Sequence, residues 1–135
     1  LAADSLGASQ TMLDMAVSYS KERKQFNRVI GSFQAVKHMC AEMTSELEPC
    51  YSLVWHAAHS FDNDEDNSKL MACHAKSHVS EISKEVSKKA TEVHGGMGFT
   101  DLLGLHYWFK RIGLNRQLLG APEVVRAEAA KIQGF

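Results

Sequence analysis

Proline is almost absent from this sequence of 135 residues, which contains only Pro49 and Pro122. Because proline interrupts helices, so few across this length favour an α-helical protein. Cysteine is also scarce, with three residues and no Cys-x-x-Cys pair. That pattern argues against a disulfide framework or a cysteine-rich zinc site and favours a reducing compartment, so we expect a cytoplasmic protein.

The sequence also lacks a strong charge of either sign and any long apolar run. A formal net charge of -1 gives no electrostatic support for binding nucleic acid or an anionic membrane. No stretch approaches the roughly 20 apolar residues that a membrane helix needs, so we expect neither partner. With 44% hydrophobic and 23% charged residues, the composition is that of a globular domain with a core. The first residue is Leu1 rather than Met, and we expect residues 1–135 to be one domain of a longer protein.

Apolar residues recur at helical spacing along most of the chain, and no strand-like alternation or internal repeat is present. The pattern predicts helices over residues 1–24, 32–61, 67–94 and 105–119, and a short one that begins at Pro122. Residues 25–32, the acidic run 62–66 and residues 97–104 are expected to connect them. The predicted fold is therefore all-α, an antiparallel up-and-down four-helix bundle with a short C-terminal helix.

Two of these helices show clear buried faces. Steps of four and three alternate along the second helix, which is typical of a bundle seam, through Val36, Cys40, Met43, Leu47, Cys50, Val54, Ala57 and Phe61. Pro49 lies within this helix and predicts a kink. The third helix has a corresponding face made of Met71, Ala75, Val79, Ile82, Val86, Ala90 and Val93. Gly95 and Gly96 are expected to end it, because glycine tolerates the left-handed conformation.

Two motifs carry a resemblance to a known family. The first, between the first two helices, reads Arg23-Lys24-Gln25-Phe26-Asn27, followed by Ile30 and Phe33-Gln34. The second ends the third helix and reads Glu92-Val93-His94-Gly95-Gly96-Met97-Gly98-Phe99-Thr100. An aromatic and basic run, His106 to Arg111, follows in the fourth helix. In this order and on these helices, the motifs resemble the C-terminal helical domain of the acyl-CoA dehydrogenases.

The resemblance implies FAD as cofactor and the α,β-dehydrogenation of an acyl-CoA thioester as the reaction. It also implies a homo-oligomer, either a dimer or a tetramer, whose core the bundles form, and an electron-transfer flavoprotein as a possible electron acceptor. FAD would lie between subunits, so this domain would supply part of the site for a neighbour's flavin. The cofactor-binding residues carried over with the motifs are Arg23, Gln25, Phe26, Gln34, Glu92, His94, Gly95 and Gly96.

The chemistry of these residues suits a dinucleotide. The guanidinium of Arg23 matches a pyrophosphate in bidentate geometry, and the amide of Gln34 bonds to sugar or phosphate. Gly95 and Gly96 allow a ligand to approach the backbone. Each also has a structural interpretation: Arg23 compensates a helix dipole, the glycines end a helix, and Phe26 packs in a core or offers its face to an adenine.

Three positions depart from the family pattern. Asn27 replaces a glycine, which the turn tolerates because asparagine visits the left-handed region readily. Glu92 replaces a glutamine, and its carboxylate would repel a phosphate but could accept a hydrogen bond from the adenine amino group or from a hydroxyl. Leu119 falls where the family often places the glutamate that removes the α-proton of the substrate. Leucine accepts no proton, although its backbone N–H remains a donor for a thioester carbonyl.

Three explanations of Leu119 stay open. The base could lie on the first helix, upstream of Leu1, with Asp4 the one carboxylate close to that region. The chain could be a subunit of a heteromeric dehydrogenase whose partner carries the base. The activity could be lost or changed, with Glu123 a weak substitute that is more simply a surface residue of the last helix.

Two hypotheses from other functional classes are a metal site and a non-catalytic assembly module. His56 and His59 on the second helix and His74 and His78 on the third could meet across an antiparallel pair, but no Glu-x-x-His or His-Glu-x-x-His pattern supports a metal site. The main rival to the flavoenzyme is a non-catalytic assembly module. In either case we expect the isolated domain to self-associate through exposed apolar surface.

Overall fold

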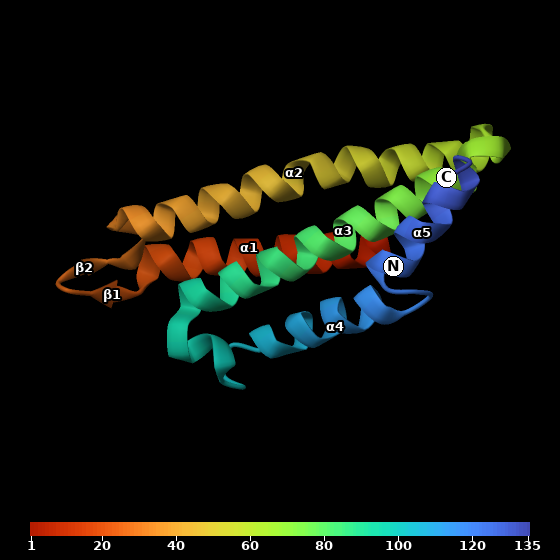
Figure 1. Cartoon of the computed structure of the whole chain (residues 1–135). Helices are drawn as coiled ribbons and strands as arrows, with labels where there is room; N and C mark the ends of the chain where they lie inside the picture. Colours follow the sequence, from red (N-terminus) through yellow and green to blue (C-terminus); the bar gives the residue numbers. More distant parts are fainter.

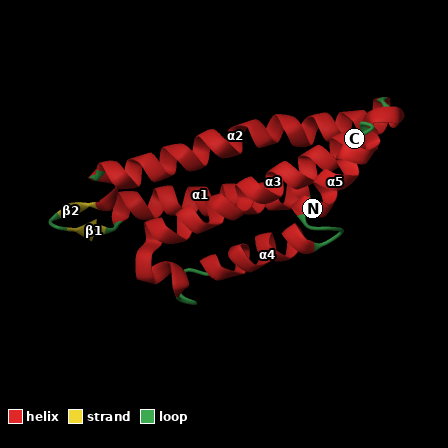
Figure 2. Cartoon of the chain, viewed as in Figure 1, coloured by secondary structure: helices red, strands yellow, loops and turns green.

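The chain forms a helical bundle in a computed structural model that describes all of residues 1–135 (Figures 1 and 2). Its helices are α1 (Ala2–Glu22), α2 (Gln34–Asn63), α3 (Glu65–His94), α4 (Leu105–Gln117) and α5 (Pro122–Ile132). The first four alternate in direction, and the short α5 packs against α3. The predicted all-α antiparallel bundle with a short last helix is confirmed. None of the helices combines the length and apolar character of a membrane span.

Helix α3 is the centre of the bundle, because it packs against each of the other four helices. The predicted Ala75, Val79, Val86 and Ala90 are buried, but so are several hydroxyl residues that the apolar pattern did not include. The Ser87 hydroxyl donates to Lys84 O at 2.7 Å, and Thr91 Oγ1 donates to Ser87 O at 2.8 Å. Their own helix thus satisfies the hydroxyls of Ser87 and Thr91, and their small side chains leave room for the neighbouring helices.

The predicted seam of α2 is fully buried only in the middle of the helix and is partly buried on either side. Met43, Leu47 and Cys50 are fully enclosed, whereas Phe61, predicted to end the seam, is 78% exposed. The prediction was therefore wrong at Phe61, because the periodic pattern does not show where a neighbouring helix ceases to cover the face. Helix α2 continues through Pro49 without interruption.

The acidic run 62–66 is not a loop. Only Asp64 lies outside a helix, while Glu65 and Asp66 form the first turn of α3. Carboxylates are favoured there by the helix dipole, and the Asn67 side-chain amide donates to Asp64 Oδ2 at 2.9 Å. The polar composition predicted a five-residue connection. The connection is a single residue because the carboxylates of Glu65 and Asp66 stabilise the N-terminus of α3.

The expected connection between α1 and α2 contains a small hairpin. Strands β1 (Lys24–Gln25) and β2 (Arg28–Val29) pair antiparallel and are followed by a 3-10 turn over Ile30–Ser32. The two residues at its tip, Phe26 and Asn27, have φ values of 53° and 63°. Positive φ at both positions is typical of two-residue hairpins. Asn27 therefore adopts the left-handed conformation expected of it.

Helix α3 ends at His94 with Gly95 as its C-cap, as the glycine pair predicted, and a 3-10 segment, Gly95–Phe99, leads toward α4. Helix α4 begins at Leu105 as expected but ends at Gln117 instead of residue 119. The backbone leaves the helix at Leu118, whose ψ of 135° is extended, and Leu119 follows with a φ of 58°, which is incompatible with a right-handed helix.

Candidate functional site

An open hollow of about 400 Å³ lies at the hairpin end of the bundle. Its walls come from the end of α1, the hairpin and the end of α3, and consist of Tyr19, Arg23, Gln25, Ile30, Val93, His94, Gly95, Gly96 and Met97. Five of the eight predicted cofactor-binding residues therefore meet here. They are Arg23, Gln25, His94, Gly95 and Gly96.

Gly95 and Gly96 line the hollow and Gly98 follows them in the chain, and the three positions differ in whether the structure requires glycine. A Cβ on Gly98 would come within 2.8 Å of Thr91 O, so the packing of this chain requires glycine there. Gly95 has φ 59° and ψ -140°, a conformation open almost only to glycine. Gly96 has neither constraint, since a Cβ there would meet no atom within 4 Å. The backbone at Gly96 is thus open to a ligand that approaches from outside the chain.

His94 is a fixed part of this wall. Its ring is buried and lies 4.6 Å from the ring of Tyr19, measured between centroids. Its Nδ1 is 2.7 Å from Ala90 O. A carbonyl only accepts hydrogen bonds, so Nδ1 donates a proton to it, and this bond fixes the orientation of the ring.

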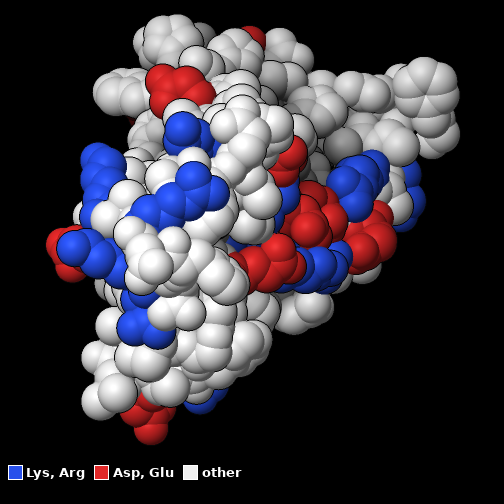
Figure 3. Space-filling view, turned by 90° about the vertical axis from the view of Figure 1, so that its left-hand side faces the viewer, with Lys and Arg blue, Asp and Glu red and all other residues white.

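The hairpin end carries basic side chains without acidic partners. None of the ion pairs in the structure involves Arg23, Lys24 or Arg28. The guanidinium of Arg28 lies 3.9 Å above the ring of Phe33. Figure 3, which looks onto this end, shows several basic side chains close together on its surface. Uncompensated positive charge beside open backbone is suited to an anionic ligand.

Three predicted residues lie outside the hollow. Phe26 is at the hairpin tip, 86% exposed, with its ring edge-on to Phe33. Gln34 begins α2, where its Nε2 is 2.9 Å from Nε2 of His38. Glu92 is exposed on α3. Within this chain these side chains do not join Arg23, and their cofactor role stays a prediction.

The turn that contains Leu119 lies near the opposite end of the bundle (Figure 1). Leu119 is 90% exposed and is one wall of an apolar hollow of about 360 Å³. The other walls are Leu1, Ala2, Ala3, Val54, Ala57, Ala58, Phe61, Ser68, Ala72, Ala75 and Lys76. The lining contains no carboxylate. The amide N–H of Leu119 has no hydrogen-bond acceptor in the chain.

The two substitute carboxylates are engaged elsewhere. Asp4 accepts from Arg111 Nε at 2.8 Å and from the side-chain amide of Asn115, and these bonds lower its pKa from 3.8 to about 2. Glu123 accepts from Arg116 Nη2 at 3.0 Å. Its pKa is lowered by a bond to its own backbone amide and by Arg116. Paired carboxylates of low pKa are poor proton acceptors, so the geometry disfavours both as the base.

The histidines of α2 and α3 have ordinary polar neighbours. The Asn63 amide lies 3.2 Å from His59 Nδ1, and Gln133 Nε2 lies 3.4 Å from His74 Nε2. No group of three or more histidine, cysteine or acidic side chains is placed to hold a metal ion.

Comparisons with known proteins show which family this chain resembles. Residues 1–133 match the family described as acyl-CoA dehydrogenase, C-terminal domain. The chain is 43% identical over 99 residues to the caffeyl-CoA reductase-Etf complex subunit CarC of Acetobacterium woodii, covering 73% of this chain and 26% of that protein. It is 36% identical over 122 residues to the acyl-CoA dehydrogenase IpdE2 of Mycolicibacterium smegmatis, covering 90% of this chain and 37% of that protein.

Solved structures show the same fold. The butyryl-CoA dehydrogenase of Megasphaera elsdenii superposes with a TM-score of 0.91 at 26% identity, over 98% of this chain and 34% of that one. A chain from a study of the electron transferring flavoprotein of Acidaminococcus fermentans gives 0.92 at 32% identity, over 98% of this chain and 35% of that one. The chain thus spans about a third of these proteins.

Proposed function

Because this chain belongs to the acyl-CoA dehydrogenase family, we propose that it is the C-terminal domain of a FAD-dependent enzyme that introduces a double bond into an acyl-CoA thioester. In that enzyme the domain contributes to the FAD site and to the core of the oligomer. The main support is the hollow at the hairpin end, where Arg23, Gly95 and Gly96 meet.

The residues of the hollow fit the diphosphate part of FAD. Arg23 has no acidic partner, and its guanidinium matches two phosphate oxygens. The backbone at Gly96 leaves space for a ligand that this chain does not fill. When bound, the flavin of FAD supplies the acceptor for the hydride that leaves the substrate. In this proposal Arg23 binds the diphosphate, and the glycines allow it to lie against the backbone.

The hollow and the Leu119 turn serve different flavins in this proposal. Lys76, beside the turn, and Gly95, in the hollow, are 19 residues apart on α3, about 28 Å at the helical rise of 1.5 Å per residue. This distance is too long for one compact pocket that holds both a hydride-transfer site at the turn and a diphosphate site in the hollow. The arrangement is consistent with a cofactor shared between neighbouring subunits.

The carboxylate that removes the α-proton lies, in this proposal, outside residues 1–135, either upstream in the same protein or on a partner subunit. Leu119 keeps water away from the reacting carbon, and its unpaired N–H can donate to the thioester carbonyl as negative charge develops there. The second hypothesis that explains Leu119 is that this protein has no dehydrogenase turnover of its own. The relative CarC is a subunit of a reductase-Etf complex. By analogy, a chain without turnover of its own would be one subunit of a heteromeric assembly with an electron-transfer flavoprotein partner.

The colour of the full-length protein tests the proposal. The purified protein is expected to absorb in the visible with one FAD per subunit, and the absorbance to bleach when a suitable acyl-CoA is added. A colourless protein that takes up no added FAD would contradict the proposal and favour an assembly module. Bound FAD that no acyl-CoA bleaches would favour the partner-subunit reading.

A second experiment concerns the base. If the base lies elsewhere, the Leu119→Ala variant keeps turnover within about tenfold of wild type, since the side chain transfers no proton. Complete loss of turnover with FAD retained would show that Leu119 itself is required.

A further inference from the structure

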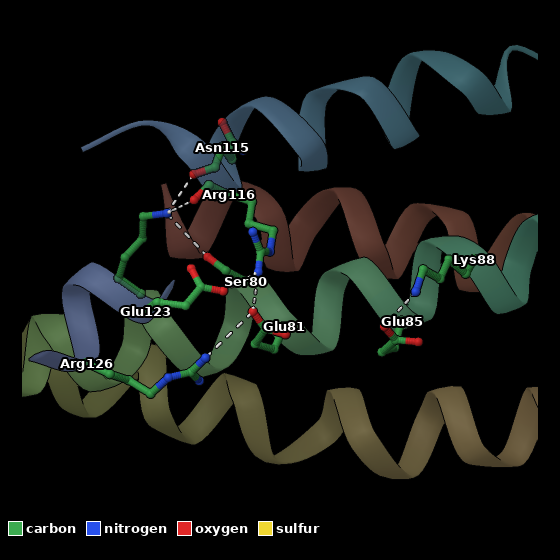
Figure 4. A network of polar contacts seen from close by, with 9 residues as sticks. Ser80, Glu81, Glu85, Lys88, Asn115, Arg116, Glu123 and Arg126 are labelled. Atoms are coloured by element: carbon green, nitrogen blue, oxygen red, sulfur yellow. Dashed lines mark hydrogen bonds and ion pairs between the residues drawn. The ribbon is translucent and has the colours of Figure 1, made fainter. Parts of the chain in front are cut away.

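The end of α4 is held by a cluster of charged side chains on three helices (Figure 4). Arg116 Nη2 donates to Glu81 Oε1 on α3 at 2.7 Å and to Glu123 Oε1 on α5 at 3.0 Å. Arg126 adds a longer ion pair to Glu81, at 3.8 Å. The Arg116 side chain is only 16% exposed, so these contacts connect α3, α4 and α5 around the turn that contains Leu119.

Lys76 of α3 contacts the same place through the backbone. Its Nζ donates to Asn115 O at 2.6 Å, to Arg116 O at 3.2 Å and to Ser80 Oγ at 3.3 Å. An ammonium group has three N–H donors, and all three are used here. Lys76 makes no ion pair with any carboxylate.

These contacts complete the hydrogen bonding of the last turn of α4. The last four carbonyls of a helix have no partner within it. In α4, Leu114 O accepts from the amide of Leu118 at 3.0 Å, and Gln117 O accepts from the amide of Gly120 at 3.2 Å. The remaining two, Asn115 O and Arg116 O, are those that Lys76 bonds. Positive charge at a helix C-terminus is also favoured by the dipole.

The geometry does not suit Lys76 as a replacement for the missing base. Burial, and then the charge of Arg116, lower the pKa of its amine. However, three acceptors surround the nitrogen and stabilise its protonated form, so no lone pair faces the apolar hollow. A cationic group that binds backbone carbonyls acts on the backbone, not on a substrate proton.

We propose that Lys76 is the positioning residue of the Leu119 turn: by capping α4 it fixes where the chain leaves the helix and hence where the free N–H of Leu119 points. Leu119 has φ 58°, an unfavourable conformation for leucine, so the turn needs support from its surroundings. Lys76 and Leu119 also line the same apolar hollow. The importance of this position for catalysis rests on the proposed function, whereas the capping does not.

The test compares the full-length wild-type protein with Lys76→Met, which keeps the apolar stem and removes the three donors. Lys88→Met is the matched control, since Lys88 is on the same helix and is paired only with Glu85 at the surface. Hydrogen exchange is measured over residues 114–121. In Lys76→Met this segment is expected to exchange about tenfold faster, with the rest of the bundle unchanged. The variant Lys76→Arg keeps a cation with several donors and is expected to retain most of the protection.

Turnover provides the second readout. With an acyl-CoA that bleaches the wild type, Lys76→Met is expected to lower kcat about tenfold, with KM and the FAD content within twofold of wild type. Unchanged exchange at residues 114–121, or faster exchange throughout the bundle, would overturn the proposal, as would equal effects of Lys76→Met and Lys88→Met. If the wild type oxidises no acyl-CoA, the proposed function fails, while the exchange comparison still decides whether Lys76 holds the turn.

Discussion

The two ends of this bundle use charge in opposite ways. At the hairpin end, Arg23, Lys24 and Arg28 have no acidic partners, and Arg23 lines a hollow with the backbone of Gly95 and Gly96. At the other end, Lys76 is bonded to backbone carbonyls, Arg116 is paired with carboxylates, and the hollow beside Lys76 is apolar. Unpaired charge next to unfilled space is suited to binding something from outside. Charge that is paired within the chain, next to an apolar surface, is suited to holding a backbone in place.

Basic residues that look alike in sequence thus have two different roles, one in binding a ligand and one in holding the backbone. Lysine and arginine occur at both ends, and composition does not distinguish them. Their partners do, because a cation that already has acceptors contributes little to ligand binding. Four predictions test this contrast, in order of decreasing expected effect.

The largest effect is expected at Arg23. In the full-length protein, Arg23→Ala removes the bidentate donor proposed for the FAD diphosphate, and charge-assisted hydrogen bonds contribute about 1.5–3 kcal/mol. FAD affinity should therefore fall by about 10- to 100-fold, measured by fluorescence titration of the apoprotein. The control is Lys131→Ala, an exposed cation of α5 near the other end. Equal affinities for wild type and Arg23→Ala would remove Arg23 from the site.

Two glycines of one motif should respond differently. A methyl group on Gly98 collides with Thr91 O, so Gly98→Ala should lower the free energy of unfolding by about 2 kcal/mol. Gly96→Ala meets no atom of this chain and should leave the urea midpoint unchanged, yet weaken FAD binding. The interpretation of Gly96 as a ligand contact is wrong if its alanine variant binds FAD as wild type does.

Of the two arginines in the charged cluster at the end of α4, Arg116 should contribute more to the stability of the fold than Arg126. Arg116→Met loses two close carboxylate contacts of a largely buried side chain, with an expected cost of about 1.5 kcal/mol in unfolding free energy. Arg126→Met loses one exposed pair at 3.8 Å and should cost less than about 0.5 kcal/mol. Urea denaturation of both variants gives the comparison, and a larger loss for Arg126→Met would contradict it.

The smallest effect is a dependence on pH at Asp4. Its pKa is lowered to about 2 in the folded state from an ordinary 3.8, so its stabilisation is present above pH 3.8 and is lost as the pH falls toward 2. Because its side chain is 36% exposed, solvent screening leaves about 1 kcal/mol. Asp4→Asn should therefore be less stable than wild type at pH 6 and nearly equal near pH 2. A constant difference at both pH values would assign the effect to something other than ionisation.

Local patterns predicted most of the fold and part of the site. The spacing of Met43, Leu47 and Cys50 and the stop at Gly95 depend on neighbours in sequence, and the structure confirms both. The resemblance of the two motifs to a known family predicted several residues of the hollow, because Arg23 and Gly96 belong to motifs at defined helix ends. Glu65 and Asp66 were misplaced because acidic residues favour both a loop and a helix N-terminus.

The Leu119 turn and its supports could not be predicted in this way. Lys76 bonds carbonyls 39 and 40 residues away, and a lysine has no sequence signal for a carbonyl partner. The partners of Asp4 on α4 are similarly distant, 107 and 111 residues along the chain. Such contacts depend on how α1, α3 and α4 pack, and that packing follows from the fold as a whole.

The most direct test is a structure of the full-length protein with FAD bound in its natural oligomer. The proposed function requires the guanidinium of Arg23 in one subunit to lie about 3 Å from diphosphate oxygens of the FAD that serves its neighbour, against the backbone at Gly96. A diphosphate held wholly by other residues, with Arg23 facing solvent, would contradict it.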